Sequence, residues 1–141
     1  MFLPRLFASA CFVPVRRHLL ALLLAACAVP VSAQDLSVSL DSARAAFEAG
    51  RAVLVDIREP DEHARGVAPG ATLLPMSQLA ARLGEIPVST DKPVLLICNT
   101  QNRSSRTLSA LRQRGYGHVR FVEGGMSEWM RRGWPTVRPA R

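Results

Sequence analysis

Residues 93–104 read PVLLICNTQNRS, and this stretch decides the fold class. Pro93 to Ile97 is a short, entirely apolar run, which is typical of a strand buried on both faces of a parallel sheet. Cys98 follows at once, and a polar loop then leads to Ser104, where we expect a helix to begin. A buried strand, a tight loop and a helix in this order predict an α/β domain.

The same alternation continues on both sides of this stretch. We predict strands at residues 38–40, 52–57, 72–74, 93–97 and 118–122. Helices are predicted at 41–49 (capped by Asp41 or Ser42), 77–83, 104–114 and 126–132, and a glycine follows most of them. The pattern predicts a central parallel sheet flanked by helices on both faces, because parallel strands need helical crossovers.

The loop after residue 97 has the features of a reactive site. Ligands of open α/β sheets bind beyond the carboxyl ends of the strands, where Cys98 stands. Successive backbone N–H groups in such a loop favour an anion, so a thiol there is expected to ionise easily. We therefore take Cys98 as the candidate catalytic residue, although a buried, inert cysteine is the alternative. The candidate substrate-binding residues are Asn99, Thr100, Gln101, Asn102, Arg103 (which offers a planar positive fork) and Ser104.

The first 33 residues have the pattern of an export signal. Three arginines (Arg5, Arg16 and Arg17) precede the uncharged apolar run from Leu19 to Ala28, and Val31-Ser32-Ala33 offers a cleavage site. We predict a signal peptide at 1–33, a domain at 34–141 and a periplasmic location. An alternative is a lipoprotein signal at 1–26, since Leu24-Ala25-Ala26-Cys27 resembles a lipobox; only a lipidated Cys27 would attach the protein to a membrane.

Composition and charge exclude several classes of protein. With 141 residues, 48% hydrophobic and 21% charged, the chain has the composition of one globular domain. Removal of residues 1–33 lowers the net charge from +7 to +4, and the remaining arginines are scattered, so we expect no nucleic-acid partner. Cys98 is then the only cysteine left. We expect no metal site, because only His63 and His118 remain, and His63 is expected to be a solvated surface residue.

Five short motifs follow one another between about residue 38 and Pro135. They are Asp56-Ile57-Arg58-Glu59-Pro60 with Glu62, Gly66 with Pro69-Gly70-Ala71, Cys98 with Arg103-Ser104, Gly115-Tyr116 with Val119, and Gly124-Gly125 with Trp129, Gly133 and Pro135. Together, and in this order, they resemble the motifs of the rhodanese family. The resemblance implies a single rhodanese-like α/β domain.

The resemblance also implies a sulfurtransferase that needs no cofactor. In such an enzyme Cys98 takes sulfur from a small sulfur-containing anion or a persulfide, carries it as a persulfide, and passes it to a thiol or protein acceptor. Residues 99–103 form the cradle, and Arg103 closes the loop or contacts the anion. Asp56 and Arg58 either brace the pocket as an ion pair or lie in a surface turn. A non-catalytic sulfur carrier that binds a partner and a redox-sensing thiol are the alternative functions.

The loop departs from the family pattern at two positions. Asn99 stands in place of an arginine, and Gln101 stands in place of a glycine. If residue 101 adopts a positive φ, a side chain there costs about 1 kcal/mol. The lost arginine is expected to weaken attraction for a dianion such as thiosulfate. Four residues separate Cys98 from Arg103, whereas phosphatases of similar fold have five, so a phosphatase is not expected.

Overall fold

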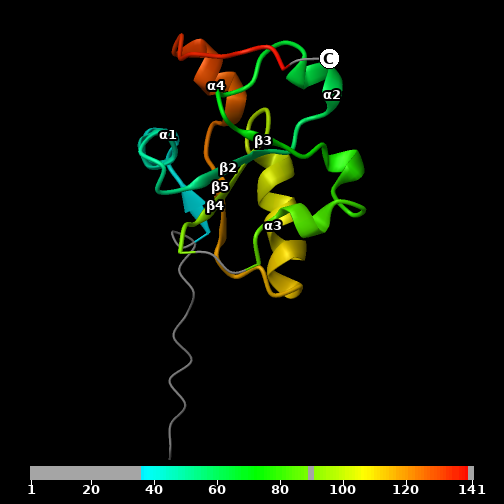
Figure 1. Ribbon diagram of the computed structural model, residues 1–141. Coiled ribbons are helices and arrows are strands. Elements are labelled where there is room, and N and C mark those ends of the chain that lie inside the picture. Colours follow the sequence, from blue (N-terminus) through cyan, green and yellow to red (C-terminus); the bar gives the residue numbers. More distant parts are fainter. Residues whose placement is uncertain (1–35, 89–90, 140–141) are drawn as a thin grey trace, which may run out of the picture.

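Five parallel strands form the centre of the computed structural model, which describes residues 36–88 and 91–139 (Figure 1). The strands are β1 (Ser37–Val38), β2 (Val53–Asp56), β3 (Thr72–Leu73), β4 (Val94–Ile97) and β5 (Val119–Val122). Their spatial order is β1-β5-β4-β2-β3, and every neighbouring pair is parallel. The strand that precedes Cys98 is therefore the central one, and the predicted parallel α/β fold is confirmed.

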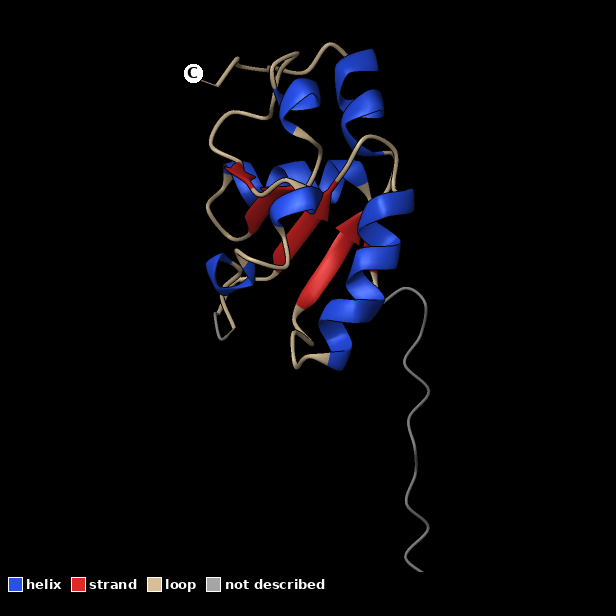
Figure 2. Cartoon of the chain, turned by 90° about the vertical axis from the view of Figure 1, so that its right-hand side faces the viewer, coloured by secondary structure: helices blue, strands red, loops and turns tan. Residues whose placement is uncertain are grey.

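Helices cover the sheet on both faces (Figure 2). They are α1 (Leu40–Glu48), α2 (Pro60–His63), α3 (Asn102–Gln113) and α4 (Gly125–Arg131), together with the short 3-10 turns η2 (Met76–Gln78) and η3 (Leu83–Glu85). One buried cluster lies between the sheet and α3, and the other lies between the sheet and the pair α1 and α4.

Alternation along β4 decides on which face the cysteine lies. Val94, Leu96 and Cys98 belong to the cluster on the α3 face, whereas Leu95 and Ile97 belong to the opposite cluster. All five are at most 2% exposed. Because a fully buried aliphatic side chain contributes about 2 kcal/mol, a shift of one residue in register would be costly, and the position of the thiol is fixed by the strand.

The predicted helix at residues 77–83 is wrong. The chain forms η2 and η3 there, with irregular turns between them. In a 3-10 turn, residues three apart lie on the same side, which places Ile86 behind the partly buried Leu83. Ile86 has no exposed surface. Tertiary packing therefore overrides the helical pattern of this segment.

Three further boundaries differ from the prediction. Ser39, and not Asp41 or Ser42, caps α1: its side chain accepts a hydrogen bond from the Ser42 N–H at 3.3 Å. The helix α3 begins at Asn102 and not at Ser104. The short helix α2 was not predicted; its proline stands in the first turn, where a missing N–H costs nothing.

The predicted signal peptide and its alternative, a lipidated Cys27, lie outside the described residues. Within residues 36–88 and 91–139, none of the helices combines the length and the apolar character that crossing a bilayer requires.

Candidate active site at the end of strand β4

Cys98 lies directly after the central strand, at its carboxyl end. It is a free cysteine with only 1% of its surface exposed. Its Sγ lies 3.5 Å from the Oγ of Ser104, which is completely buried in the first turn of α3. Ser104 in turn donates a hydrogen bond to the Gln101 carbonyl at 3.1 Å, so the loop closes over the thiol.

Helix α4 holds the carbonyl groups of the loop. The Met126 N–H donates to the Cys98 carbonyl and the Ser127 N–H donates to the Asn99 carbonyl, both at 2.8 Å. The Ser127 hydroxyl donates a second, short hydrogen bond to the Asn99 carbonyl. Because these carbonyl oxygens are turned toward α4, the dipoles of the loop have a fixed direction.

The N–H groups of the loop have no such partners. Within the part of the chain that the structure describes, no hydrogen bond involves the backbone N–H of any residue from 99 to 104. Consecutive unpaired N–H groups, followed by the amino end of the 12-residue helix α3, favour negative charge. The loop can therefore stabilise an anion bound next to Cys98.

The guanidinium of Arg103, which was predicted to close the loop or to contact the anion, is held by a carboxylate. Its two terminal nitrogens donate to Glu62 of α2, each at 2.6 Å. The hydrogen bonds from Arg103 hold the pKa of Glu62 at about 2, below the ordinary value of 4.5. The same carboxylate raises the pKa of Arg103. This ion pair connects the beginning of α3 to α2, and it compensates the positive charge of Arg103.

Asp56 and Arg58 form the buried ion pair that was one of the two predictions for them. Arg58 donates from Nη2 to an Asp56 oxygen at 2.7 Å and from Nε to both oxygens at 3.0 Å. Its Nη2 also donates to the Gly66 carbonyl at 2.8 Å. Since neither residue is more than 1% exposed, the alternative of a surface turn is wrong.

His63 also differs from the prediction, since it is not a solvated surface residue. It is 4% exposed, and its Nε2 lies 3.4 Å from Asp56 Oδ1. It lies in α2, and its ring lies beside Asp56, the last residue of β2. The sequence pattern around it is polar, so only the tertiary fold reveals the burial.

The middle of the loop faces solvent. Asn99, Thr100, Gln101 and Asn102 are exposed. Gln101 has a φ of −170°, an extended conformation that any residue adopts, so the glycine of the family pattern is not required here. Its side-chain oxygen accepts a hydrogen bond from the Gly124 N–H at 3.1 Å, which connects the loop to the start of α4.

Gly125 is a site residue whose role the sequence did not reveal. Its φ is +61°, and a Cβ placed there would lie 2.5 Å from the Cys98 carbonyl oxygen and closer still to that of Thr100. Only glycine lets the loop and α4 approach this closely. The pair Gly124-Gly125 was a visible signal, but a sequence does not show what lies opposite a glycine.

Two sequence comparisons show which known proteins this chain is similar to. The Rhodanese-like domain family matches residues 39–132. A protein of Allochromatium vinosum named Sulfurtransferase is 42% identical over 87 residues, which are 62% of this chain and 79% of that protein.

Among the described residues there is no group of three His, Cys, Asp or Glu side chains that could hold a metal ion.

Solved structures agree with these sequence matches. A rhodanese-related protein of Thermoplasma volcanium superimposes with a TM-score of 0.65 at 27% identity, covering 74% of this chain and 99% of that one. The human single-domain sulfurtransferase TSTD1 superimposes with a TM-score of 0.58 at 30% identity, covering 67% of this chain and 95% of that one.

Proposed function

The chain belongs to the Rhodanese-like domain family, and from this premise we propose that it is a sulfurtransferase that carries sulfur as a persulfide on Cys98. The observation that carries the proposal is the run of unpaired N–H groups at residues 99–104, which follows directly after the thiol. A persulfide anion is a negatively charged group of the size that such a loop can surround.

The proposed reaction has two displacement steps. The Cys98 thiol first loses its proton to solvent, and the thiolate attacks the outer sulfur of the donor. A sulfur–sulfur bond forms on Cys98, and the donor's own sulfur bond breaks, with its electron pair leaving on sulfite or on a thiolate. An acceptor thiolate or cyanide then attacks the outer sulfur, and Cys98 departs as a thiolate. The loop N–H groups stabilise the anion that exists between the two steps.

In this mechanism the side chains around the loop act by positioning it. Glu62 fixes Arg103, and α4 fixes the carbonyl groups of Cys98 and Asn99. Ser104 lies close enough to contact the sulfur of Cys98. Asp56 and Arg58 support the neighbouring strand end, and within the described part of the chain they form no hydrogen bond or ion pair with residues 98–104.

Mass spectrometry of the full chain tests the proposal. After incubation with thiosulfate or an alkyl persulfide, we expect a mass increase of one sulfur atom on the peptide that contains Cys98, and its loss on addition of cyanide. Cys98→Ser should abolish the increase, whereas the matched thiol variant Cys27→Ser should keep it. Sulfur loading that survives Cys98→Ser would contradict the proposal.

The burial of the thiol favours one second candidate, a sulfur carrier that exchanges sulfur with a protein partner. Only 1% of Cys98 is exposed, so a partner that opens the loop would control access. In the same experiment, a persulfide that small thiols and cyanide leave in place would support the carrier. Oxidation of Cys98 without sulfur transfer would instead indicate a redox sensor.

We also propose that the protein is exported to the periplasm. The basic and apolar pattern of residues 1–33 supports this location, and cleavage before Gln34 or lipidation of Cys27 are its two forms. N-terminal sequencing of the cellular product, combined with detergent partitioning, distinguishes them. Full-length protein recovered from the cytoplasm would contradict both.

A further inference from the structure

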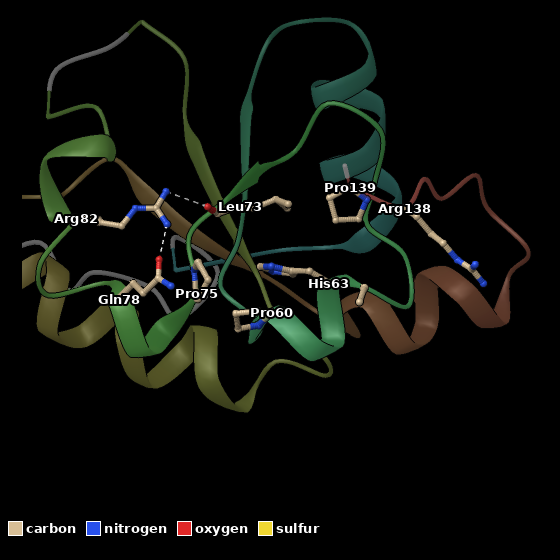
Figure 3. Close-up of a pocket in the computed structure, with 9 residues that line it drawn as sticks. Pro60, His63, Leu73, Pro75, Gln78, Arg82, Arg138 and Pro139 are labelled. Atoms are coloured by element: carbon tan, nitrogen blue, oxygen red, sulfur yellow. Dashed lines mark hydrogen bonds between the residues drawn. The ribbon is translucent and has the colours of Figure 1, made fainter. Parts of the chain in front are cut away.

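A cavity separate from the Cys98 loop lies between α2, the segment after β3, and the C-terminal residues Arg138 and Pro139 (Figure 3). Its volume is about 560 Å³, which is within the range of small-molecule sites. None of residues 98–104 lines it, and its strand β3 stands two positions from β4 in the sheet.

The C-terminal wall of this cavity is fixed to the body of the domain. Val67 and Val137 exchange two backbone hydrogen bonds, both 2.9 Å long, immediately before Arg138. Gly66 lies against Thr136, and an added Cβ on Gly66 would come within 3.1 Å of the threonine Oγ1. The wall is therefore part of the folded structure and not a loose tail.

The ring of His63 lines this cavity. Its ring extends from α2 into the space beside Leu73 and Pro60 (Figure 3). His63 is 96% buried, and its Nε2 forms no hydrogen bond to any described residue, with the Asp56 carboxylate 3.4 Å away. Both oxygens of Asp56 already accept hydrogen bonds from Arg58. The Nε2 atom therefore lies against Asp56, inside the domain, and the rest of the ring borders the cavity.

The charge of the cavity has one sign. The lining residues include two arginines, at opposite sides, and no acidic residue. Arg82 is paired with Glu85 at 2.6 Å and also binds the Gln78 side chain. Arg138 extends toward solvent and forms no ion pair with any residue in the described part of the chain. The uncompensated charge is therefore positive.

We propose that this cavity binds a small organic anion, namely a carboxylate or sulfonate carried on an apolar body. The apolar body contacts Pro60, Pro75 and Leu73, and the acidic group lies on the side of His63 in the positive field of the arginines. This binding goes beyond the proposed sulfur transfer, since it uses no atom of Cys98.

Two fluorescent probes of matched shape test the proposal on the full chain. Anilinonaphthalene sulfonate has the proposed chemistry, and N-phenyl naphthylamine is its neutral counterpart. We expect saturable binding of the sulfonate, about ten-fold tighter than that of the neutral probe. Amide NMR shifts caused by the sulfonate should cluster at Ala64, Leu73 and Gln78.

Variants separate the charge from the shape of the cavity. Arg138→Gln changes an exposed side chain and should weaken sulfonate binding about three-fold, without changing binding of the neutral probe. His63→Phe should weaken sulfonate binding about ten-fold, with thermal unfolding as the check that it folds. Cys98→Ser should leave both probes unaffected, so this proposal and the sulfur-transfer proposal fail independently.

Three results would overturn the proposal. They are equal affinity for the two probes, sulfonate affinity unchanged by Arg138→Gln, and NMR shifts that cluster away from this cavity.

Discussion

At the end of β2, the buried Asp56 and Arg58 bind each other, whereas at the end of the neighbouring β4 the buried Cys98 is followed by unpaired N–H groups. The two strands pair along their whole length, so these two ends lie at the same edge of the sheet. Asp56 and Arg58 nevertheless form hydrogen bonds with each other, whereas the N–H groups after Cys98 have no hydrogen-bond partner among the described residues.

The difference indicates a structural role for the end of β2 and a chemical role for the end of β4. A buried ion pair in which both carboxylate oxygens accept hydrogen bonds, as those of Asp56 do from Arg58, stabilises one conformation. Unpaired N–H groups cost folding free energy, and a bound anion recovers it. The sheet thus places a satisfied strand end next to an unsatisfied one, and the unsatisfied end is where we place the sulfur chemistry.

The largest effect on stability is expected at the satisfied end. Arg58→Met leaves the Asp56 carboxylate buried beside an uncharged side chain, and it should lower the free energy of unfolding by about 3–5 kcal/mol in urea denaturation. The double variant Asp56→Leu with Arg58→Met should recover much of this loss, because no unpaired charge remains. Cys98→Ser should change stability by less than about 1 kcal/mol. An Arg58→Met protein as stable as the parent would remove the distinction between the two strand ends.

The next effect concerns the contact that shapes the unsatisfied end. In Gly125→Ala the new Cβ meets the carbonyl groups of Cys98 and Thr100, so the loop must move. We expect kcat/KM for sulfur transfer to fall about a hundred-fold, or about 2.7 kcal/mol.

Gly50→Ala is the matched control for this change. Gly50 has a similar φ of +67°, but a Cβ there meets nothing within 4 Å. It should cost about 1 kcal/mol of stability and no activity. Equal activity losses in the two variants would show that backbone strain, and not loop position, is responsible.

A smaller effect is expected from adding charge to the loop. Asn99→Arg places a cation beside the unpaired N–H groups, and it should raise kcat/KM for thiosulfate about ten-fold, equivalent to about 1.4 kcal/mol. High salt should remove part of the gain. Gln101→Gly should not raise kcat/KM, because the native Gln101 already has an extended conformation. The variant would also lose the hydrogen bond that the Gly124 N–H donates to the Gln101 side chain. An unchanged kcat/KM in Asn99→Arg would show that charge does not decide the choice of donor.

The smallest effect comes from the ion pair between Glu62 and Arg103. The pKa of Glu62 is held at about 2 in the folded protein, against 4.5 ordinarily, so its stabilisation is present above about pH 4.5 and is lost as the pH falls toward 2. Glu62→Gln should therefore be about 1 kcal/mol less stable at pH 7, because solvent screens this partly exposed pair.

Unfolding measured across this pH range tests the assignment. The difference between Glu62→Gln and the parent should disappear between pH 4.5 and 2. The control Glu48→Gln breaks an exposed helical pair with Arg44 and should cost only about 0.3 kcal/mol. A difference that stays constant down to pH 2 would contradict the ion pair as its cause.

Local sequence patterns were sufficient to predict the sheet. The apolar runs that form β2 and β4 are buried on both faces of the sheet. Strands of this kind are recognisable in a sequence as short, continuous apolar segments. The position of Cys98 followed from the same pattern, since a loop after a parallel strand opens at the carboxyl edge.

The errors arose where distant residues decide the outcome. The partner of Arg103 is Glu62, 41 positions away, and the loop sequence alone does not reveal this ion pair. Ser77 is bound by Glu59, 18 positions away, in the segment where a helix was predicted. His63 is buried beside Asp56 at the end of β2, and nothing in its polar neighbourhood along the sequence indicates this.

Both edges of the sheet are strands of only two residues, β1 (Ser37–Val38) and β3 (Thr72–Leu73). An exposed strand edge can pair with a second molecule and start edge-to-edge aggregation, and short edges offer little template for this. The apolar strand Val94–Ile97, whose side chains would suit a cross-β core, is enclosed between β2 and β5. The order of the strands thus keeps this apolar segment away from other molecules as long as the domain stays folded.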